Sequence, residues 1–357
     1  MTDQRTRGAT VRVAVIGDSA AQSPPGTART EITEPAPTGW LPGALIQLRE
    51  RGVPGYTLDL APTGAEFRYD LVHVVGHGAA ADAAVRAAQT TGVPVVTGYR
   101  EDTPADTAAA LHAASRLVLS PSRGADLALE LQGVSPQRIA RWVPGVDLKR
   151  FHPARYAPEV LPEGFTILCA GPVTRALGVD LLADAFLIAH DRDPRIRLAL
   201  AGAGPGVDRI CARIGAAATV LGALDPDRLA AVYATADLLV FPGTSEAHAH
   251  VILEAQASGL PVLALDTGSA AELIENGRSG CLVAPDPEVL GSAISGLARR
   301  EALRDRLATG GLIAVRQRSW EHSIAQLAEA YGRALTGLAP PTEGTHTALG
   351  AEVARAA

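Results

Sequence analysis

Residues 238–285 read LLVFPGTSEAHAHVILEAQASGLPVLALDTGSAAELIENGRSGCLVAP. An apolar run of strand character ends at Pro242, a loop of small residues follows, and the pattern predicts a helix over roughly 249–258. Gly259 ends this helix, and Pro261 begins the next apolar run. A strand, a loop, a helix and a second strand in this order predict a parallel α/β unit. The loop and the start of the helix should then lie at the carboxyl edge of the sheet.

The same alternation of short apolar runs and helical segments extends over nearly all of the 357 residues. Strands are predicted in the first half at 11–17, 56–60, 70–76, 93–98 and 116–122, and in the second half at 165–171, 195–202, 218–222, 237–243, 260–266 and 280–285. Helices are predicted between them, for example at 41–51, 79–91 and 122–132, and a last helix at 310–335. The chain therefore belongs to the α/β class, with two Rossmann-like domains whose parallel sheets face each other across a ligand cleft.

A proline-bearing stretch, FHPARYAPEVLPEG at 151–164, interrupts the alternation and predicts the linker between the domains. We accordingly expect an amino-terminal domain over residues 1–152, a linker over 153–164 and a carboxyl-terminal domain over 165–335. Residues 336–357 are small, polar and aperiodic, which predicts a disordered tail.

Composition excludes several classes of partner. The formal charge of −6 is spread along the chain, so it predicts neither nucleic-acid binding nor a polybasic surface for anionic lipid. No run of 18 or more apolar residues and no apolar leader is present, which predicts a cytoplasmic protein without a transmembrane segment, with peripheral membrane association left open. Cys169, Cys211 and Cys281 lie far apart in apolar contexts, which favours buried small hydrophobes over a metal site.

Motifs for other chemistries are incomplete or have a simpler explanation. The run AGAGPG at 201–206 lacks the third glycine of a dinucleotide fingerprint, and no G-x-S-x-G nucleophile elbow occurs. The pair Asp225 and Asp227 precedes an apolar run with Pro226 between them, which favours helix capping over metal binding. His73 lies in a predicted strand and is interpreted as structural, whereas His77 is placed at the cleft.

Two glutamates stand out in the deciding stretch. Glu246 lies in the loop and Glu254 in the helix, so both are expected at the carboxyl edge of the sheet. Glu254 sits in the apolar run VILEAQA, where a carboxylate needs a partner, and a hydroxyl-rich ligand would provide one. The helix N-terminus near 249–251 offers free amide groups and partial positive charge to a phosphate. Together these features predict a sugar phosphate as ligand.

The whole passage resembles the retaining GT-B glycosyltransferases of family 4, whose pattern is E-x-F-G-x-x-x-x-E-A-M-A-S-G-x-P-V followed by a Gly-containing turn, P-E and G-x-x-G-x-L-V. The resemblance continues outside it. YDLVHVVG (69–76) and GVPVVTGY (92–99) are similar to the amino-domain strands of the family. WVPGVDLKRFHP (142–153) resembles its linker signature, and LGALDPDRLAAVYATADLLVFP (221–242) its nucleotide-side segment. The similarity covers roughly 70–335 well and 1–69 poorly.

This resemblance implies transfer of a hexose from a nucleotide-diphosphate sugar, of the GDP-mannose or UDP-hexose type, to a small-molecule or lipid-linked hydroxyl acceptor. It implies that no metal and no cofactor are required. By the same resemblance Glu246 is a catalytic residue that binds the hydroxyls of the transferred sugar, and Glu254 binds the ribose. The amides of the helix start bind the diphosphate, and the turn after the strand at 218–222 binds the base; the donor-binding residues are thus His248, Ala249, His250, Val251, Gly222, Ala223 and Leu224.

The chain departs from the family pattern at its phosphate-binding cations. In G-P-V-T-R-A-L-G (171–178) these two positions are Pro172 and Leu177, and Arg100 stands where the family has an amino-domain histidine. We expect Arg175, and secondarily Arg100, to replace the missing positive charges, with Arg100 also assigned a catalytic role. The alternative is a catalytically degraded GT-B homologue that acts as a binding or scaffold subunit. A nucleotide-sugar epimerase is a third interpretation.

Overall fold

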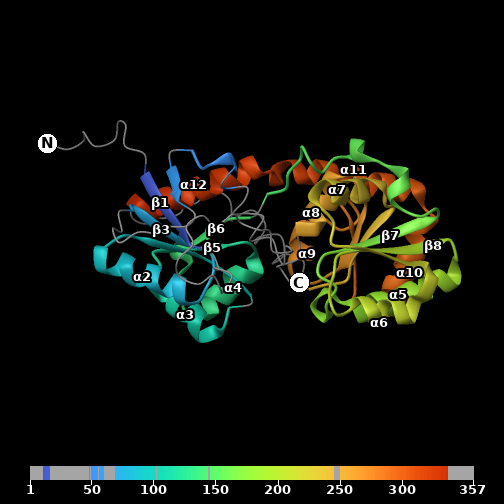
Figure 1. The fold of residues 1–357 in the computed structure, drawn as a ribbon, viewed down its shortest axis with the longest axis horizontal. Helices are drawn as coiled ribbons and strands as arrows, with labels where there is room; N and C mark the ends of the chain where they lie inside the picture. The colour runs from blue at the N-terminus through green and yellow to red at the C-terminus, as the bar shows by residue number, and fades with distance from the viewer. Residues whose placement is uncertain are drawn as a thin grey trace, which may run out of the picture.

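The computed structural model describes residues 11–16, 48, 50–54, 56–59, 69–101, 103–143, 145–244 and 250–336 (Figure 1). The described part forms two α/β halves that lie side by side, each built on a six-stranded sheet in which the paired strands are parallel. This arrangement confirms the predicted fold class.

The sheet of the first half has the order β2-β1-β3-β4-β5-β6. Its strands are β1 (Val11–Ile16), β2 (Tyr56–Asp59), β3 (Leu71–Val74), β4 (Val95–Gly98), β5 (Leu117–Ser120) and β6 (Ile139–Arg141). The described helices are α2 (Ala79–Thr91), α3 (Ala105–Ala114), α4 (Arg123–Leu131) and the 3-10 turn η1 (Pro136–Arg138). All five predicted strands are confirmed, and β6 is an addition. Most of the helix predicted at 41–51 lies outside the described residues.

The sheet of the second half has the order β12-β11-β10-β7-β8-β9. Its strands are β7 (Phe165–Ala170), β8 (Ile196–Ala201), β9 (Ala218–Gly222), β10 (Leu238–Phe241), β11 (Val262–Leu265) and β12 (Cys281–Val283). The helices are α5 (Val179–Arg192), α6 (Val207–Ile214), α7 (Pro226–Thr235), α8 (His250–Ala257), α9 (Gly268–Leu273), α10 (Pro287–Ala298) and α11 (Glu301–Val315). Short 3-10 turns lie at η2 (Pro153–Arg155), η3 (Pro158–Val160), η4 (Arg175–Leu177), η5 (Gly215–Ala217) and η7 (Arg316–Arg318). All six predicted strands are confirmed.

The central strands of the second sheet are buried because they are apolar on both faces. β10 and β11, for example, are buried at every position, as expected for parallel strands covered by helices on both sides. Helix starts follow the expected capping chemistry, since the Asp225 carboxylate accepts hydrogen bonds from the backbone N–H groups of Asp227 and Arg228. The interpretation of Asp225 as a helix cap is therefore confirmed.

The last helix, α12 (Trp320–Thr336), returns to the first half and packs on its sheet (Figure 1). The Tyr331 hydroxyl lies 2.8 Å from Nδ1 of the fully buried His73 on β3, which confirms His73 as a structural residue. The single helix predicted at 310–335 is wrong, because α11 ends at Val315 and the chain turns through η7 before α12 begins. The turn η7 therefore leads the chain from the core of the second half to the core of the first.

Two segments pass between the halves beside each other. The outgoing segment donates a hydrogen bond from Val146 N to Arg318 O at 2.9 Å, and a Cβ on Gly145 would lie 2.5 Å from the Trp320 backbone. The predicted linker at 153–164 follows this crossing and packs on α7, with Ala157 N donating to Thr235 Oγ1 at 3.0 Å. Helix α12 thus packs with the first half although it falls within the expected domain 165–335. Within the described residues, no helix combines the length and apolar character needed to cross a membrane.

Candidate functional site

The site lies at the carboxyl edge of the second sheet, where the strand order reverses. β7 pairs with β10 on one side and β8 on the other, so the loops after β7 and β10 diverge at this point. In open parallel sheets such a divergence leaves space for a ligand beyond the strand ends. The loop after β7 carries Arg175, and the loop after β10 leads to α8 and Glu254.

The loop after β7, residues 171–178, is held rigidly by backbone contacts. Val173 N donates to Ala203 O at 3.0 Å, and Gly206 N donates to Val173 O at 2.9 Å. Gly178 has a φ of 77°, and a Cβ there would lie 2.2 Å from Pro242 O, so only glycine fits between this loop and the end of β10. The loop after β7 is therefore fixed against the end of β10 at Pro242.

Arg175 is the cation that this loop presents. Its side chain is 81% exposed, and its Nε lies 3.9 Å from Asp180 Oδ2, a loose contact. Asp180 is held more closely by Arg209, whose Nη1 lies 3.1 and 3.0 Å from the two carboxylate oxygens. Leu177, in contrast, is fully buried in the core and has no polar group to offer. The structure thus leaves Arg175 able to reorient, because its partner is already paired.

The turn after β9 lies at the same edge of the sheet. Gly222 has a φ of 70° and forms a bridge with Gly202 at the end of β8. Ala223 is exposed and Leu224 half-buried, so this turn presents a small surface beside the ends of β8 and β9. The predicted base-binding residues are therefore near neighbours at the expected edge.

Helix α8 follows the loop after β10 and carries the central carboxylate. Its observed span, His250–Ala257, agrees with the helix predicted at 249–258. Val251 is buried and His250 half-buried. The predicted residues Glu246, His248 and Ala249 lie outside the described residues, so their predicted roles stay predictions. Of the two glutamates, the structure places Glu254.

Glu254 is surrounded by groups that its own sequence motif does not reveal. Its Oε2 is buried and has no hydrogen-bond partner within the described part of the chain. The Tyr233 hydroxyl, from α7, is wholly buried beside it, and Arg150 approaches from the segment that crosses between the halves. Phe151 packs edge-on against the Tyr233 ring, with centroids 5.8 Å apart.

These surroundings change the acidity of the carboxyl group. Burial raises the pKa of Glu254 from 4.5 to about 7, although hydrogen bonding by the Tyr233 hydroxyl and the charge of Arg150 both lower it. Tyr233 Oη has no well-formed hydrogen bond within the described residues, so this contact stops short of ideal geometry. Burial, with a contribution from Glu254, raises the pKa of Tyr233 well above its ordinary value. A carboxyl group that titrates near neutrality, with one oxygen unsatisfied, is characteristic of a functional site.

The sequence offered a signal for these neighbours. Tyr233 lies in the segment resembling the nucleotide side of the family, and Arg150 in the segment resembling its linker. Neither segment shows from its own spacing that it approaches Glu254. The contact depends on α7 packing beside α8 and on the path of the crossing segment.

The first half presents its own carboxyl edge. Arg100 and His77 follow β4 and β3, respectively, and both are half-buried. Arg100 is thus placed at the edge from which it was predicted to act, on the half opposite Glu254. The two edges meet where Glu272 of α9 contacts the start of α4.

Comparison with known proteins gives two matching family profiles. The profile described as "Glycosyltransferase Family 4" matches residues 4–150, and that described as "Glycosyl transferases group 1" matches residues 164–300. The two matches together cover both halves of the molecule.

Three of the sequence relatives are D-inositol 3-phosphate glycosyltransferases. D-inositol 3-phosphate glycosyltransferase 1 of Catenulispora acidiphila is 32% identical over 311 residues, which are 75% of this chain and 73% of the relative. D-inositol 3-phosphate glycosyltransferase 2 of the same organism is 34% identical over 249 residues, which are 63% of this chain and 58% of the relative. The Nocardia farcinica protein is 34% identical over 247 residues, 62% of this chain and 53% of its own. The chain thus spans little more than half the length of the last two.

Solved structures share the fold at lower identity. HepE of Anabaena, solved in complex with UDP and glucose, superposes with a TM-score of 0.72 at 16% identity, over 91% of this chain and all of that one. A glycosyltransferase from Rickettsia africae gives a TM-score of 0.73 at 15% identity, over 92% of this chain and 99% of that one. These likenesses bear on the fold.

Proposed function

This chain belongs to the family 4, group 1 glycosyltransferases of the GT-B fold, and from that premise we propose that it transfers a hexose from a nucleoside diphosphate sugar to a hydroxyl acceptor, with retention of configuration. The donor binds at the carboxyl edge of the second sheet. The acceptor binds at the facing edge of the first.

One observation carries the donor site: Oε2 of Glu254 is buried and has no hydrogen-bond partner among the described residues. A polar atom that is buried without a partner costs on the order of 1–3 kcal/mol, which a ligand hydroxyl would recover by donating to it. The ribose of a nucleotide presents two adjacent hydroxyls of this kind. Binding a hydroxyl also favours the ionised carboxylate, since hydrogen bonds to the charged form lower a pKa.

The other donor contacts follow from positions around Glu254. The diphosphate is proposed to lie at the N-terminus of α8, where the amides of the first turn and the helix dipole favour an anion. Arg175 supplies the positive charge that Pro172 and Leu177 do not. The turn at 222–224 supports the base, and Glu246 contacts the hydroxyls of the transferred sugar.

The identities of donor and acceptor are proposed from the named relatives. HepE was solved with UDP and with UDP-glucose, so a UDP-hexose is the first donor to test, and GDP-mannose the second. The relatives named for D-inositol 3-phosphate make a cyclitol phosphate the first acceptor to test, before lipid-linked hydroxyl acceptors. Arg100, on the acceptor side, is proposed to reach the reacting groups from across the cleft. We further propose that transfer needs no metal ion, so activity should persist in excess EDTA.

Calorimetric titration with UDP, GDP and their sugars, each beside its nucleoside, tests the donor site. We expect one nucleoside diphosphate to bind measurably, its nucleoside to bind more weakly, and Glu254→Ala to abolish the heat. No binding of any of them at millimolar concentration to folded protein would contradict the proposal.

A second candidate function is supported by the loop after β7. Leu177 is buried, and the exposed Arg175 is the cation that the described part of this loop presents to a diphosphate. Such a site would suit a degraded homologue that serves as a binding or scaffold subunit. Nucleotide binding without any transfer or donor hydrolysis, across the acceptor panel, would favour this alternative.

A further inference from the structure

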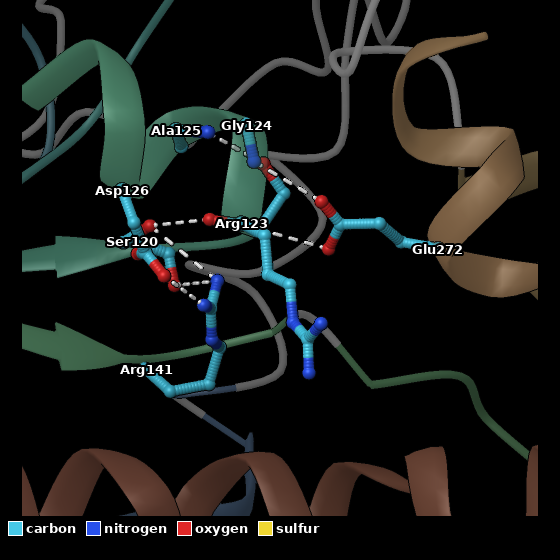
Figure 2. Close-up of polar contacts among 8 residues, drawn as sticks. Ser120, Arg123, Gly124, Ala125, Asp126, Arg141 and Glu272 are labelled. Atoms are coloured by element: carbon cyan, nitrogen blue, oxygen red, sulfur yellow. Dashed lines mark hydrogen bonds and ion pairs between the residues drawn. The ribbon is translucent and has the colours of Figure 1, made fainter. Parts of the chain in front are cut away.

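A carboxylate of the second half caps a helix of the first half (Figure 2). Glu272, in α9, accepts a hydrogen bond from Arg123 N at Oε2 over 2.9 Å and one from Gly124 N at Oε1 over 3.1 Å. Arg123 and Gly124 open α4, nearly 150 residues earlier in the chain. The contact therefore joins the carboxyl edges of the two sheets directly.

The start of α4 leaves these two amides in need of an acceptor. Ser122 caps the helix, and its hydroxyl accepts a hydrogen bond from Ala125 N at 2.9 Å. The first N–H groups of a helix have no partner within it, and together with the helix dipole they favour a negative charge. The carboxylate of Glu272 supplies both the charge and two acceptor oxygens, in a bidentate arrangement.

The start of α4 is itself fixed within the first half. Arg141 at the end of β6 forms an ion pair with Asp126 in the first turn, and its Nη1 lies 3.3 Å from Ser120 O (Figure 2). Ser120 Oγ in turn donates to Ser122 O at 2.9 Å. The start of α4, which carries the amides that Glu272 contacts, is therefore held against the ends of β5 and β6.

Glu272 is also held in place within the second half, by backbone contacts of α9. Gly268, the first residue of α9, has a φ of 54°, and a Cβ there would lie 2.5 Å from Thr244 O. Thr244 is the last described residue before α8. Arg318 Nη2 also donates to the backbone oxygen of Glu272 at 3.2 Å. A displacement of α4 would therefore be transmitted through α9 to the donor side.

The neighbouring junction is not closed by apolar packing. Glu272, Arg318 and Val143 line a groove of about 630 Å³ between α9, α11 and the start of α12. Polar contacts therefore contribute more to the relative placement of the two halves here than they would in a closely packed interface. Glu275, three residues after Glu272, pairs with Arg278 in the same loop, so this ion pair does not join the two halves.

We propose that Glu272 is a positioning residue, which sets the separation of the two halves across the donor cleft by binding the Arg123 and Gly124 amides. The proposal rests on the proposed function in so far as the halves carry acceptor and donor. Within the described residues, Glu272 forms hydrogen bonds with Arg123, Gly124 and Arg318, none of which is a predicted donor-binding residue, so it acts on transfer and not on nucleotide affinity.

Hydrogen exchange tests the contact itself without requiring activity. In Glu272→Ala the amides of residues 123–124 should exchange at least tenfold faster than in the wild type, and the radius of gyration from X-ray scattering should increase. Glu275→Ala removes a nearby glutamate whose ion pair lies within one loop, so it should change neither the exchange rate nor the radius of gyration. Glu272→Gln, which retains one strong acceptor, should give an intermediate exchange rate. Unchanged exchange and scattering in a cooperatively folded Glu272→Ala would overturn the proposal.

Kinetics separates this inference from the proposed function. With the preferred donor, Glu272→Ala should keep the nucleotide Kd within about twofold of wild type and lower the rate of transfer at least tenfold. A large loss of nucleotide affinity, or an unchanged transfer rate, would overturn the positioning role. If the wild type binds no nucleotide, the proposed function fails, whereas the exchange result still decides whether Glu272 joins the halves.

Discussion

Replacing Glu254 by glutamine should stabilise the free protein while weakening its nucleotide binding at least tenfold. Glutamine fills nearly the same volume and keeps an oxygen toward Tyr233, so the substitution isolates the charge. The rise in the pKa of Glu254 from 4.5 to about 7 corresponds to roughly 3 kcal/mol, at about 1.36 kcal/mol for each tenfold change in acid dissociation. Because part of the residue is exposed, we expect about 2–3 kcal/mol.

The sign and pH window follow from linkage. The folded state holds the Glu254 proton more tightly than the unfolded state, so between pH 4.5 and about 7 the unfolded chain binds fewer protons. The free energy of unfolding of the wild type therefore falls as the pH rises through this window. Glutamine does not titrate, so the advantage of Glu254→Gln is absent near pH 4.5 and complete above pH 7.

Urea denaturation of the wild type and Glu254→Gln at pH 4.5 and pH 8 measures this difference. Glu275→Gln is the matched control, because Glu275 is exposed and, among the described residues, its carboxylate pairs with Arg278. We expect Glu254→Gln to be the more stable protein at pH 8 by about 2–3 kcal/mol and the control to equal the wild type. Added nucleoside diphosphate should stabilise the wild type but not Glu254→Gln. Equal stability of the two proteins at pH 8 would refute the burial argument.

Three further predictions concern other side chains. Arg175→Ala should weaken binding of the intact nucleotide sugar at least tenfold and leave binding of the nucleoside unchanged in calorimetry; equal loss for both ligands would exclude a phosphate role. Tyr233→Phe should raise the pH midpoint of nucleotide binding, because the hydroxyl lowers the pKa of Glu254, whereas Tyr331→Phe in the other core should leave it unmoved. Burial lowers the pKa of His73 from 6.5 to about 3, so the unfolded state binds more protons in this range and the free energy of unfolding should fall by up to about 5 kcal/mol as the pH drops. His73→Gln should reduce the fall in the free energy of unfolding at low pH. An unaltered fall would show that other groups cause it.

The strand pattern of the molecule was predictable from the sequence. Strands such as β10 and β11 are continuous apolar runs bounded by proline and glycine, and such runs form the buried strands of parallel sheets. The helix carrying Glu254 was also predictable, because Gly259 and Pro261 mark its end. These signals are local, so a single sequence reveals them.

Features that depend on contacts distant in sequence were not predictable. The apolar face of α12 does not reveal that it packs on the first sheet through Tyr331 and His73. The contact of Glu272 with the Arg123 amide joins residues 149 positions apart, and it requires both halves to be in place. The raised pKa of Glu254 likewise reflects burial in the folded molecule. Its apolar sequence neighbours indicated that the side chain would be buried, but not how far its pKa would rise.

We propose that Glu254 binds the ribose of a nucleoside diphosphate sugar. Calorimetric titration of UDP and GDP into the wild type and Glu254→Gln, at pH 8 where the carboxyl group is ionised, measures this contact. We expect saturable binding of one nucleotide to the wild type and at least a tenfold weaker affinity in Glu254→Gln, with the folded state of both proteins confirmed by denaturation. Equal affinity of the two proteins for that nucleotide would contradict it.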